Sequence, residues 1–466
     1  MNSTKVKLCF LVVFILWIAG FCLGQEPAST SQEIQKEQND SQPGQEGDAE
    51  QESIPVPIRE REEIRSLGEQ TFSDDVFQNP KNHWGFSLSA YQAYSNDVAN
   101  SNQPRLGSGI TAFMPRTFIN LGRRKSQFHV DLGAGYRIYN KNQDLNSFDY
   151  YGDAQYSLKL SKRTSLQLSD QFISSHDDSW SFISLYSPIH YNPLSSNEVL
   201  FNKQRVDRNS MIAEFNHQAS RRIRFGVLGG FRSYRYHESP LINSDAFDVG
   251  GNFYFQAAKW LYFSSTVSTY VHTAGPNFPD AEIYRVEVGG LELRLSDFWR
   301  IWAGGGFDIS DYSNRDPADQ NGQAFKKHRS KSENVNAGIG HTSPSTAFAL
   351  TYQRGFTSAI GISQMLRSDV VTASLGHRIT RRLNAQLEAY YYRSSEPEYS
   401  GFLETLSGGG GLEIALRRDL MLTMNVYYQN QRTHDFSVSG FGLGLNRFTA
   451  YLGLQYVWPS LRRTGN

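Results

Sequence analysis

One feature of this sequence constrains its fold more than any other. A tight polar turn followed by about ten to fourteen residues of alternating polarity recurs from residue 84 to residue 458. The stretch after Arg381 and Arg382 shows the pattern best, and its two alternating sets are Leu383, Ala385, Leu387, Ala389 and Tyr391 against Asn384, Gln386, Glu388, Tyr390 and Tyr392. Because successive side chains of a strand point to opposite faces, each segment predicts a β-strand with one apolar and one polar face.

The pattern predicts 18 strands between residues 84 and 458. They span residues 84–94, 108–121, 127–139, 148–160, 164–174, 208–219, 223–235, 246–257, 260–271, 282–295, 300–310, 333–342, 347–354, 367–379, 383–393, 403–416, 420–430 and 441–458. Short turns, many of them rich in Arg and Lys, alternate with longer and more varied connections. Short turns at one end and long loops at the other are typical of membrane barrels. We therefore predict an all-β fold, an antiparallel up-and-down transmembrane β-barrel of about 18 strands (16 to 18).

The two faces of these segments differ in charge, as a bilayer requires. In the segment after Gln127, the charged side chains of Asp131 and Arg137 share one face with His129 and Tyr139. The opposite face carries Phe128, Val130, Leu132, Ala134, Tyr136 and Ile138. A charge on the lipid side costs about 2 to 4 kcal/mol at the midplane, so the apolar face is expected to meet lipid.

Three places interrupt the regular pattern. The apolar phase flips around Gly289 and Gly290, and Pro115 interrupts the second strand, so we predict a β-bulge at each place. Asp170 falls on an outward position near a loop end. Either the register shifts by one residue there, or Asp170 lies above the hydrocarbon.

Aromatic residues are expected to form a girdle at each end of the barrel, because rings with one polar edge prefer the headgroup level. The tryptophans near short turns are Trp84, Trp260, Trp299, Trp302 and Trp458. The tyrosines near long loops are Tyr139, Tyr234, Tyr270, Tyr391 and Tyr428.

Residues 1–24 have the pattern of a secretory signal peptide. Two lysines precede an apolar run from Leu8 to Ala19, and small residues lead to an expected cleavage site after Gly24. The run is shorter than the roughly 20 residues of a membrane helix, and an uncleaved anchor is the alternative. Both cysteines, Cys9 and Cys22, lie in this segment, so the exported chain is expected to contain no disulfide.

Residues 25–82 have a different composition, dominated by Gln, Glu, Ser and Pro. They carry 14 acidic and 5 basic side chains, a difference of −9. Such a segment buries too little apolar surface to offset chain entropy, so we predict a disordered acidic periplasmic linker. It is expected to act as a solvated tether, or alternatively to dock a periplasmic partner. Residues 83–459 are then the transmembrane β-barrel, and residues 460–466 a short C-terminal tail.

Over residues 84–458 the chain resembles the outer-membrane β-barrel proteins of Gram-negative bacteria. The last strand carries this resemblance best, because its outward positions alternate and end on an aromatic: Phe448, Ala450, Leu452, Leu454, Tyr456 and Trp458. It looks like the terminal strand that the outer-membrane barrel assembly machinery recognises in that class, although residues 459–466 follow it. The resemblance implies a porin-like architecture, a location in the outer membrane and contact with its lipid, and it identifies no specific family.

The interior of the predicted barrel is polar. An 18-stranded barrel is wide enough for an aqueous lumen, and its inward charges have both signs. This predicts a passive pore for polar solutes, or alternatively a salt-bridged wall that only maintains the shape of the barrel. The pore-lining or constriction candidates on the strands are Arg224, Arg232, Asp248, Arg285, Glu287, Glu292, Arg294, Asp308 and Glu388.

The longest connection, residues 175–207, is the third on the long-loop side and is rich in apolar side chains. In porins the third external loop folds inward and narrows the channel, and this one is similar in order, length and composition. Trp180, Tyr186 and Tyr191 are therefore constriction candidates. The alternative is a loop that packs over the barrel mouth or against another subunit of a homo-oligomer.

Two other functional classes are alternatives to a pore. A polysaccharide or polymer secretion component would use the acidic linker as a docking segment and inward tyrosines as a sliding surface. A hydrolase at the rim would need His beside Ser or carboxylate groups, and such clusters begin at His176, His237, His341 and His434. None of these clusters matches a catalytic motif. We expect no enzymatic activity, no cofactor, no metal site and no nucleic-acid partner.

Overall fold

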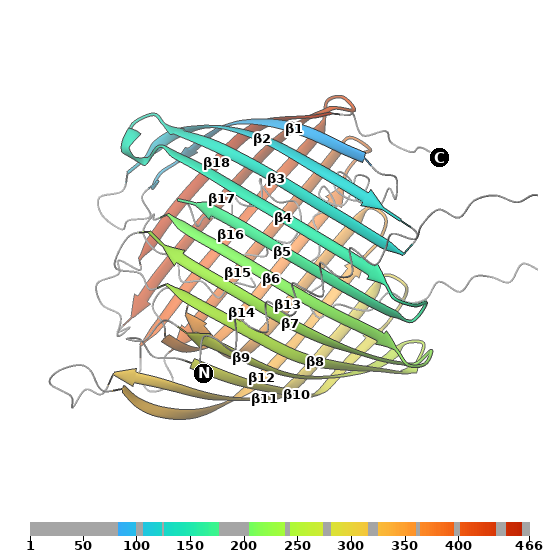
Figure 1. Ribbon diagram of the computed structural model, residues 1–466. Helices are drawn as coiled ribbons and strands as arrows, with labels where there is room; N and C mark the ends of the chain where they lie inside the picture. The colour runs from blue at the N-terminus through green and yellow to red at the C-terminus, as the bar shows by residue number, and fades with distance from the viewer. Residues whose placement is uncertain are drawn as a thin grey trace, which may run out of the picture. The chain divides into compact units, whose positions relative to one another are not determined.

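The computed structural model describes residues 83–98, 106–123, 125–176, 205–237, 243–273, 281–315, 325–359, 364–395, 401–434 and 444–458. These residues form one 18-stranded sheet (Figure 1). Its strands are β1 (His83–Ser95), β2 (Ser108–Gly122), β3 (Ser126–Tyr139), β4 (Ser147–Lys159), β5 (Thr164–Ser175), β6 (Val206–Gln218), β7 (Ile223–Tyr236), β8 (Ser244–Ala258), β9 (Leu261–Thr273), β10 (Ala281–Arg294), β11 (Trp299–Arg315), β12 (Phe325–Thr342), β13 (Thr346–Ala359), β14 (Gln364–Arg378), β15 (Leu383–Ser395), β16 (Phe402–Ala415), β17 (Leu420–His434) and β18 (Leu445–Trp458).

Each strand pairs antiparallel with its neighbours in sequence, and the first strand pairs with the last. The β1–β18 ladder runs from Phe86 opposite Trp458 to Ser95 opposite Thr449, so the sheet closes on itself. The predicted all-β, antiparallel up-and-down barrel is confirmed, as is the architecture of an outer-membrane β-barrel. The predicted signal peptide, acidic linker and C-terminal tail lie outside the described residues.

Helical structure is minor among the described residues. The connection between β3 and β4 contains a short 3₁₀ helix, η2 (Gln143–Leu145). The described ranges contain no helix that is long and apolar enough to cross a membrane.

The alternation of side chains gives the barrel two different faces. In β3, His129, Asp131 and Arg137 are buried on the inner face, whereas Leu132 and Tyr136 are exposed on the outer face. Exposed apolar side chains occupy outward positions on strands around the whole barrel, among them Leu88, Phe113, Val227, Val249, Val267, Leu350, Leu387, Leu412, Val426 and Leu452. So much exposed apolar surface marks a face that meets lipid or another apolar partner.

The predicted irregularities have different outcomes. The ladders of β10 with β9 and β11 both shift register between Glu287 and Leu291, which confirms the bulge at Gly289 and Gly290. The predicted bulge at Pro115 is wrong, because β2 keeps one register with β1 and with β3 on both sides of it. Proline lacks an N–H, so it interrupts a ladder without adding a residue.

Asp170 lies on the outer face of β5, where its carboxylate accepts a hydrogen bond from Asn209 Nδ2 at 2.8 Å. The strand keeps a continuous register with β4 and β6 at this point. The outward position predicted for Asp170 is therefore real, and the alternative of a shifted register is wrong.

The girdle predictions are confirmed in part. Trp84 and Trp458 are exposed on the outer face near the short-turn end, with ring centroids 5.1 Å apart, and Trp260 and Trp299 are also exposed. Trp302 faces inward, where its ring fills the space beside Gly338 on β12. Tyr139, Tyr234 and Tyr270 face inward as well, since their position in the alternation places them with the polar set. The exposed aromatics toward the long-loop end include Tyr94, Tyr136, Phe148, Tyr284, Tyr428 and Phe448.

The strands β11 to β14 extend beyond their predicted ends at the long-loop side. β11 continues to Arg315 and β12 begins at Phe325, so this hairpin is longer than the alternating pattern indicated (Figure 1). The β12–β13 ladder nevertheless stops at Val335 opposite Arg354, although both strands continue. The backbone ladder between β11 and β12 needs no apolar pattern, which is why the polar sequence after Phe325 did not reveal it.

Candidate functional site: the inner face of the barrel

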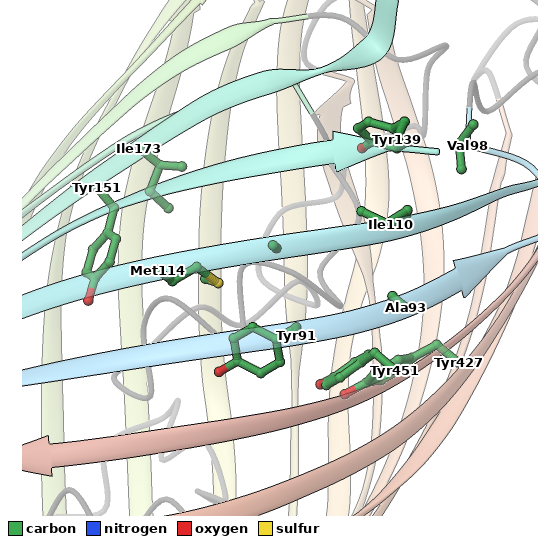
Figure 2. Close-up of a cluster of buried hydrophobic side chains, with 11 residues drawn as sticks. Tyr91, Ala93, Val98, Ile110, Met114, Tyr139, Tyr151, Ile173, Tyr427 and Tyr451 are labelled. Atoms are coloured by element: carbon green, nitrogen blue, oxygen red, sulfur yellow. The ribbon is translucent and has the colours of Figure 1, made fainter. Parts of the chain in front are cut away.

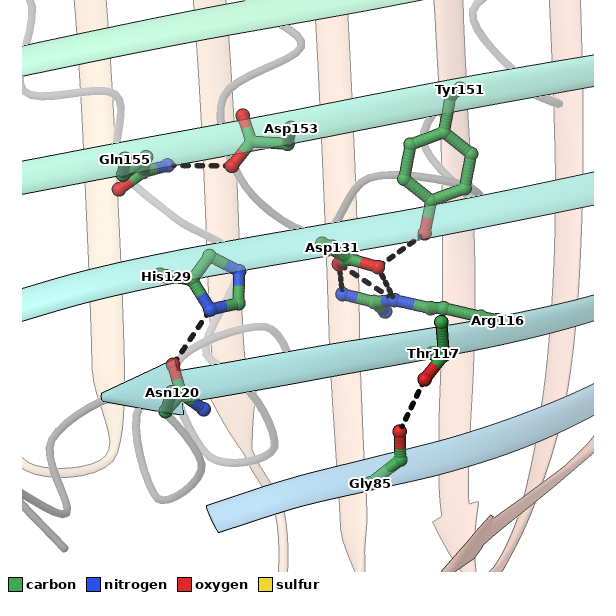
Figure 3. Close-up of polar contacts among 9 residues, drawn as sticks. All are labelled: Gly85, Arg116, Thr117, Asn120, His129, Asp131, Tyr151, Asp153 and Gln155. Carbon is green, nitrogen blue, oxygen red and sulfur yellow. Dashed lines mark hydrogen bonds and ion pairs between the residues drawn. The ribbon is translucent and has the colours of Figure 1, made fainter. Parts of the chain in front are cut away.

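The inner face between β2 and β4 carries a network of charged and polar groups around Asp131 (Figure 3). Arg116 Nε donates to both carboxylate oxygens of Asp131, at 2.8 and 2.7 Å. Tyr151 Oη donates to the same carboxylate at 3.0 Å. Within β4, Gln155 Nε2 donates to Asp153 Oδ1 at 3.1 Å. Each strand supplies an inward residue at the same level, so the register of β2, β3 and β4 builds the network.

A second network links the inner face to the start of the long connection after β5. Arg137 Nε donates to Asp149 Oδ2 at 2.6 Å, and Arg137 Nη2 donates to Ser175 Oγ at 2.9 Å. The backbone N–H of His176 donates to Asp149 Oδ1 at 3.2 Å. The last described residues of this end of the connection are therefore tied to the inner face of β3 and β4.

Across the barrel, a third network surrounds Asp308 on β11. Its carboxylate accepts hydrogen bonds from Arg285 Nε (3.0 Å), Arg285 Nη2 (2.9 Å), Asn334 Nδ2 (3.0 Å) and the backbone N–H of Phe356 (2.8 Å). The Asp308 side chain is 0% exposed, whereas Arg285 remains 34% exposed. Four donors compensate the buried carboxylate, which otherwise would be very unfavourable.

Further pairs complete this side of the barrel. Arg232 Nη2 lies 3.8 Å from Asp248 Oδ1, between β7 and β8. Arg294 Nε donates to Glu292 Oε1 at 3.0 Å, and the Arg294 guanidinium carbon lies 4.2 Å from the centroid of the Tyr262 ring. On this side of the barrel, Arg232, Arg285 and Arg294 thus each lie near a carboxylate and stay partly exposed.

Tyrosines form a distinct part of the inner face at β1, β17 and β18 (Figure 2). The ring centroid of Tyr451 lies 6.1 Å from that of Tyr91 and 6.0 Å from that of Tyr427. Two of these rings cover a glycine of a neighbouring strand: a Cβ at Gly453 would overlap Tyr91, and one at Gly409 would overlap Tyr427. The glycines therefore make room for the Tyr91 and Tyr427 rings against the wall, and the Tyr91 and Tyr451 rings meet edge to face, with planes 81° apart.

The structure brings some predicted site residues together and leaves others apart. Arg285 contacts Asp308, Arg232 lies near Asp248, and Glu292 contacts Arg294, while Glu287 bonds with Asn336 Nδ2. Arg224 and Glu388 lie apart from these pairs. Arg224 is paired with Tyr254 of β8 near a short turn, and Glu388 of β15 is paired with Gly409 of β16. Trp180, Tyr186 and Tyr191, the candidates in the third long connection, lie outside the described residues.

Sequence reasoning missed the inward role of Arg116. It follows Pro115, where a bulge was expected, and a bulge would have reversed the faces of the residues beyond it. The signal that identifies it is the constant two-residue spacing from Arg116 to Phe118 and Asn120, which are buried on the same inner face.

The histidines of the predicted rim clusters have separate surroundings. His237 Nε2 lies 2.8 Å from Asp207 Oδ2. The rings of His341 and His434 lie beside Trp299 and Phe402, each pair with centroids 4.6 Å apart. The carboxylate and serine neighbours of His176, His237 and His434 in sequence fall outside the described residues. Within the described ranges, no group of three or more His, Cys, Asp or Glu side chains could hold a metal ion.

No protein-family model matches the sequence, and no curated protein matches it. Solved structures are similar to this chain, and three of them are named here. They are Acinetobacter baumannii OccAB4 (10% identity, 81% of this chain and 99% of that chain, TM-score 0.41), Pseudomonas aeruginosa OpdK with vanillate (9%, 82% and 99%, 0.42) and Pseudomonas aeruginosa OccK2 (OpdF) in complex with glucuronate (9%, 82% and 98%, 0.40).

Proposed function

We propose that this chain is an outer-membrane β-barrel that forms an aqueous pore for the passive passage of polar solutes. The observation that carries the proposal is the contrast between its two faces. Ionised groups occur on the inner face from Arg116 on β2 to Asp308 on β11, while the outer face exposes large apolar side chains. Ions on the inside and hydrocarbon-like groups on the outside suit a wet lumen within a lipid bilayer.

The partly exposed cations favour a lumen in contact with water over a wall of salt bridges alone. Arg285 and Arg294 keep 34% and 30% of their side-chain surface exposed although each contacts a carboxylate. A charge exposed inside a barrel is favourable only where water or a polar solute can reach it. These side chains are the groups that a passing solute would meet.

The third long connection, residues 175–207, is proposed to narrow the lumen. Its support is the position of Ser175 and His176, which bond with Arg137 and Asp149 on the inner face. Chain that leaves β5 at this point starts from the interior side of the wall. Deleting residues 181–200 should then raise solute flux, whereas a loop that lies over the mouth or against a second subunit would leave flux through the lumen unchanged.

The proposal is tested by swelling of liposomes that contain the purified barrel. Neutral sugars of increasing size should enter with rates that fall as their size grows, because passive flow through a wet pore depends on solute size. Liposomes with the protein that swell no faster than protein-free liposomes, for the smallest sugars as well, would rule out an open pore.

Export of a polysaccharide is the second candidate, favoured by the tyrosine surface. Tyr91, Tyr451 and Tyr427 lie side by side, and Tyr390 and Tyr392 lie nearly parallel, with centroids 6.2 Å apart and planes 9° apart. Ring faces are suitable surfaces for sugars, and of these five rings Tyr390 is the one that is not buried. Deleting residues 25–75 should block polymer export without affecting barrel assembly if the acidic linker docks a periplasmic partner, and export that continues in this variant would exclude that route.

Assembly through the last strand is a further part of the proposal. β18 ends on Trp458, which is exposed on the outer face, and its outward positions carry Leu452, Leu454 and Tyr456. These features support recognition of β18 by the barrel assembly machinery of the outer membrane.

A further inference from the structure

The barrel wall has one ladder that ends early, and it lies beside a hairpin that turns inward. The β12–β13 ladder stops at Val335 opposite Arg354, although β12 begins at Phe325 and β13 ends at Ala359. Beyond Arg354, β13 remains paired with β14 from Gly355 opposite Ser368 to Ala359 opposite Gln364. We call the two segments 355–359 and 364–368 the inner hairpin.

Two hydrogen bonds show that the inner hairpin lies on the interior side of β12. The backbone N–H of Phe356 donates to Asp308 on β11, and the carbonyl oxygen of Phe356 accepts from Arg285 Nη2 on β10 at 3.1 Å. β12 lies between β11 and β13 in the sheet order. Because Asp308 and Arg285 point inward, Phe356 can reach both only by passing across the inner face of β12.

Apolar packing fixes the same position independently of the charges. Phe356 and Met365 from the inner hairpin form a buried cluster with Ala281, Ile283 and Tyr312, and Tyr270 packs against this cluster. These partners come from β9, β10 and β11. The inner hairpin therefore covers the inner face of these strands on the long-loop side.

Gly355 is the point at which the hairpin leaves the wall. A Cβ at this position would lie 2.7 Å from Asp308 Oδ2 and 2.8 Å from Arg285 Nη2, so any larger residue would have to displace these two groups. On the outside, Glu333 of β12 forms ion pairs with Arg354 of β13 and with Arg367 of β14, and these two pairs link the three strands where the β12–β13 ladder is absent. The outer link is exposed and contributes little stability.

We propose that the inner hairpin is a restriction of the lumen and that Asp308 is the positioning residue that holds it inward. This inference rests on the proposed pore function. The inner hairpin is separate from the third long connection. It belongs to β13 and β14 and packs on β9 to β11, whereas the third long connection follows β5 and is tied to β3 and β4. Loss of the Asp308 charge weakens the acceptor of the Phe356 N–H and the hold on Arg285, so the hairpin can return to the β12 edge.

The first test compares two carboxylates of the same strand. Asp308→Asn keeps the shape but weakens the acceptor for Arg285 and Phe356, and Asp311→Asn removes a carboxylate that pairs with Arg329 at the outer face. In planar bilayers, Asp308→Asn should increase the unitary conductance and shift selectivity toward anions, and Asp311→Asn should match the wild type. Equal conductance and selectivity of all three proteins overturn the role of Asp308.

The second test reads the hairpin position without using the pore. Continuing the β12–β13 register past Val335 and Arg354 would place Ser332 opposite Thr357. Directly opposed residues are close enough for a disulfide, and the native cysteines are only Cys9 and Cys22. While the hairpin lies inward, Ser332 and Thr357 are not opposed, so the pair Ser332→Cys with Thr357→Cys should stay reduced under a mild oxidant. When Asp308→Asn lets the hairpin return to β12, the same pair should crosslink.

The crosslinking result does not depend on whether the barrel conducts, so it separates failure of the hairpin proposal from failure of the pore proposal. Rapid crosslinking of the cysteine pair with Asp308 intact would overturn the inward position of the hairpin, and no crosslinking in the Asp308→Asn background would overturn the holding role of Asp308. Gel mobility with and without reductant measures both. If no variant conducts while the crosslinking follows the expectation, the pore proposal fails and the position of the hairpin stands.

Discussion

Arg137 and Asp149 form a buried ion pair on the inner face, in which Arg137 Nε donates to Asp149 Oδ2 at 2.6 Å and the two side chains are 0% and 2% exposed. Removing one partner of a buried pair leaves an uncompensated charge, which costs about 3 to 5 kcal/mol. Arg137→Met should therefore lower the free energy of unfolding by that amount, measured by urea unfolding of the barrel in detergent micelles.

The control for this prediction is Arg235→Met. Arg235 pairs with Asp245 at 2.6 Å, but the two side chains are 44% and 33% exposed, so the loss should stay below about 1 kcal/mol. Equal losses for Arg137→Met and Arg235→Met would contradict the burial of the Arg137 pair.

An arginine should destabilise the barrel at one of two adjacent positions in β15 and be tolerated at the other. Leu387 is 57% exposed on the outer face, and Glu388 next to it lies on the inner face. Leu387→Arg places a charge against lipid and should cost about 2 to 4 kcal/mol of folding free energy in bilayers. Glu388→Arg should fold with near-native stability. Similar losses for the two variants would mean that the faces are assigned incorrectly.

The position of the Tyr151 ring on the inner face requires a small residue beside it. A Cβ at Gly133 would overlap the Tyr151 ring, whereas the corresponding space at Gly229 has no atom within 4 Å. Gly133→Ala should lower stability by about 1 to 3 kcal/mol through overpacking, and it should also displace the Tyr151 hydroxyl from Asp131. Gly229→Ala should have little effect in the same denaturation experiment, and a larger loss at Gly229 than at Gly133 would be inconsistent with this packing.

The cations near the short-turn end should influence ion selectivity. The Arg294 guanidinium of β10 lies over the Tyr262 ring. On the neighbouring strand β11, the Arg300 guanidinium carbon lies 5.5 Å from the centroid of the Trp302 ring. Charge on a pore wall attracts counter-ions. The double variant Arg294→Gln with Arg300→Gln should lower the chloride-to-potassium permeability ratio, read from the reversal potential in a KCl gradient. Arg235→Gln on the outer side is the control, and a ratio that changes equally in both would locate the effect outside the lumen.

Much of this fold could be predicted from the sequence because the strand period of two is visible wherever one face meets an apolar surface. The segments after Gln127 and Arg382 have clean alternation, and their faces follow directly from it. The bulge at Gly289 was visible for the same reason, since an inserted residue reverses the alternation.

The parts that could not be predicted depend on contacts between distant segments. The sequence around Gly355 shows only a strand near its end, and the bond from Phe356 to Asp308 depends on how β13 crosses β12. The girdle positions expected for Tyr234 and Trp302 are wrong, because aromatic type was given more weight than position in the alternation. The pairing of Arg116 with Asp131 needed the correct register at Pro115, which composition does not provide.

Single-channel conductance of the purified barrel in a planar bilayer tests the pore most directly. We expect discrete, stable current steps in KCl, which decrease when neutral sugars that fit the lumen are added, and larger steps after deletion of residues 181–200. A correctly folded barrel that passes no ions, both with its full sequence and after this deletion, would contradict the proposed function.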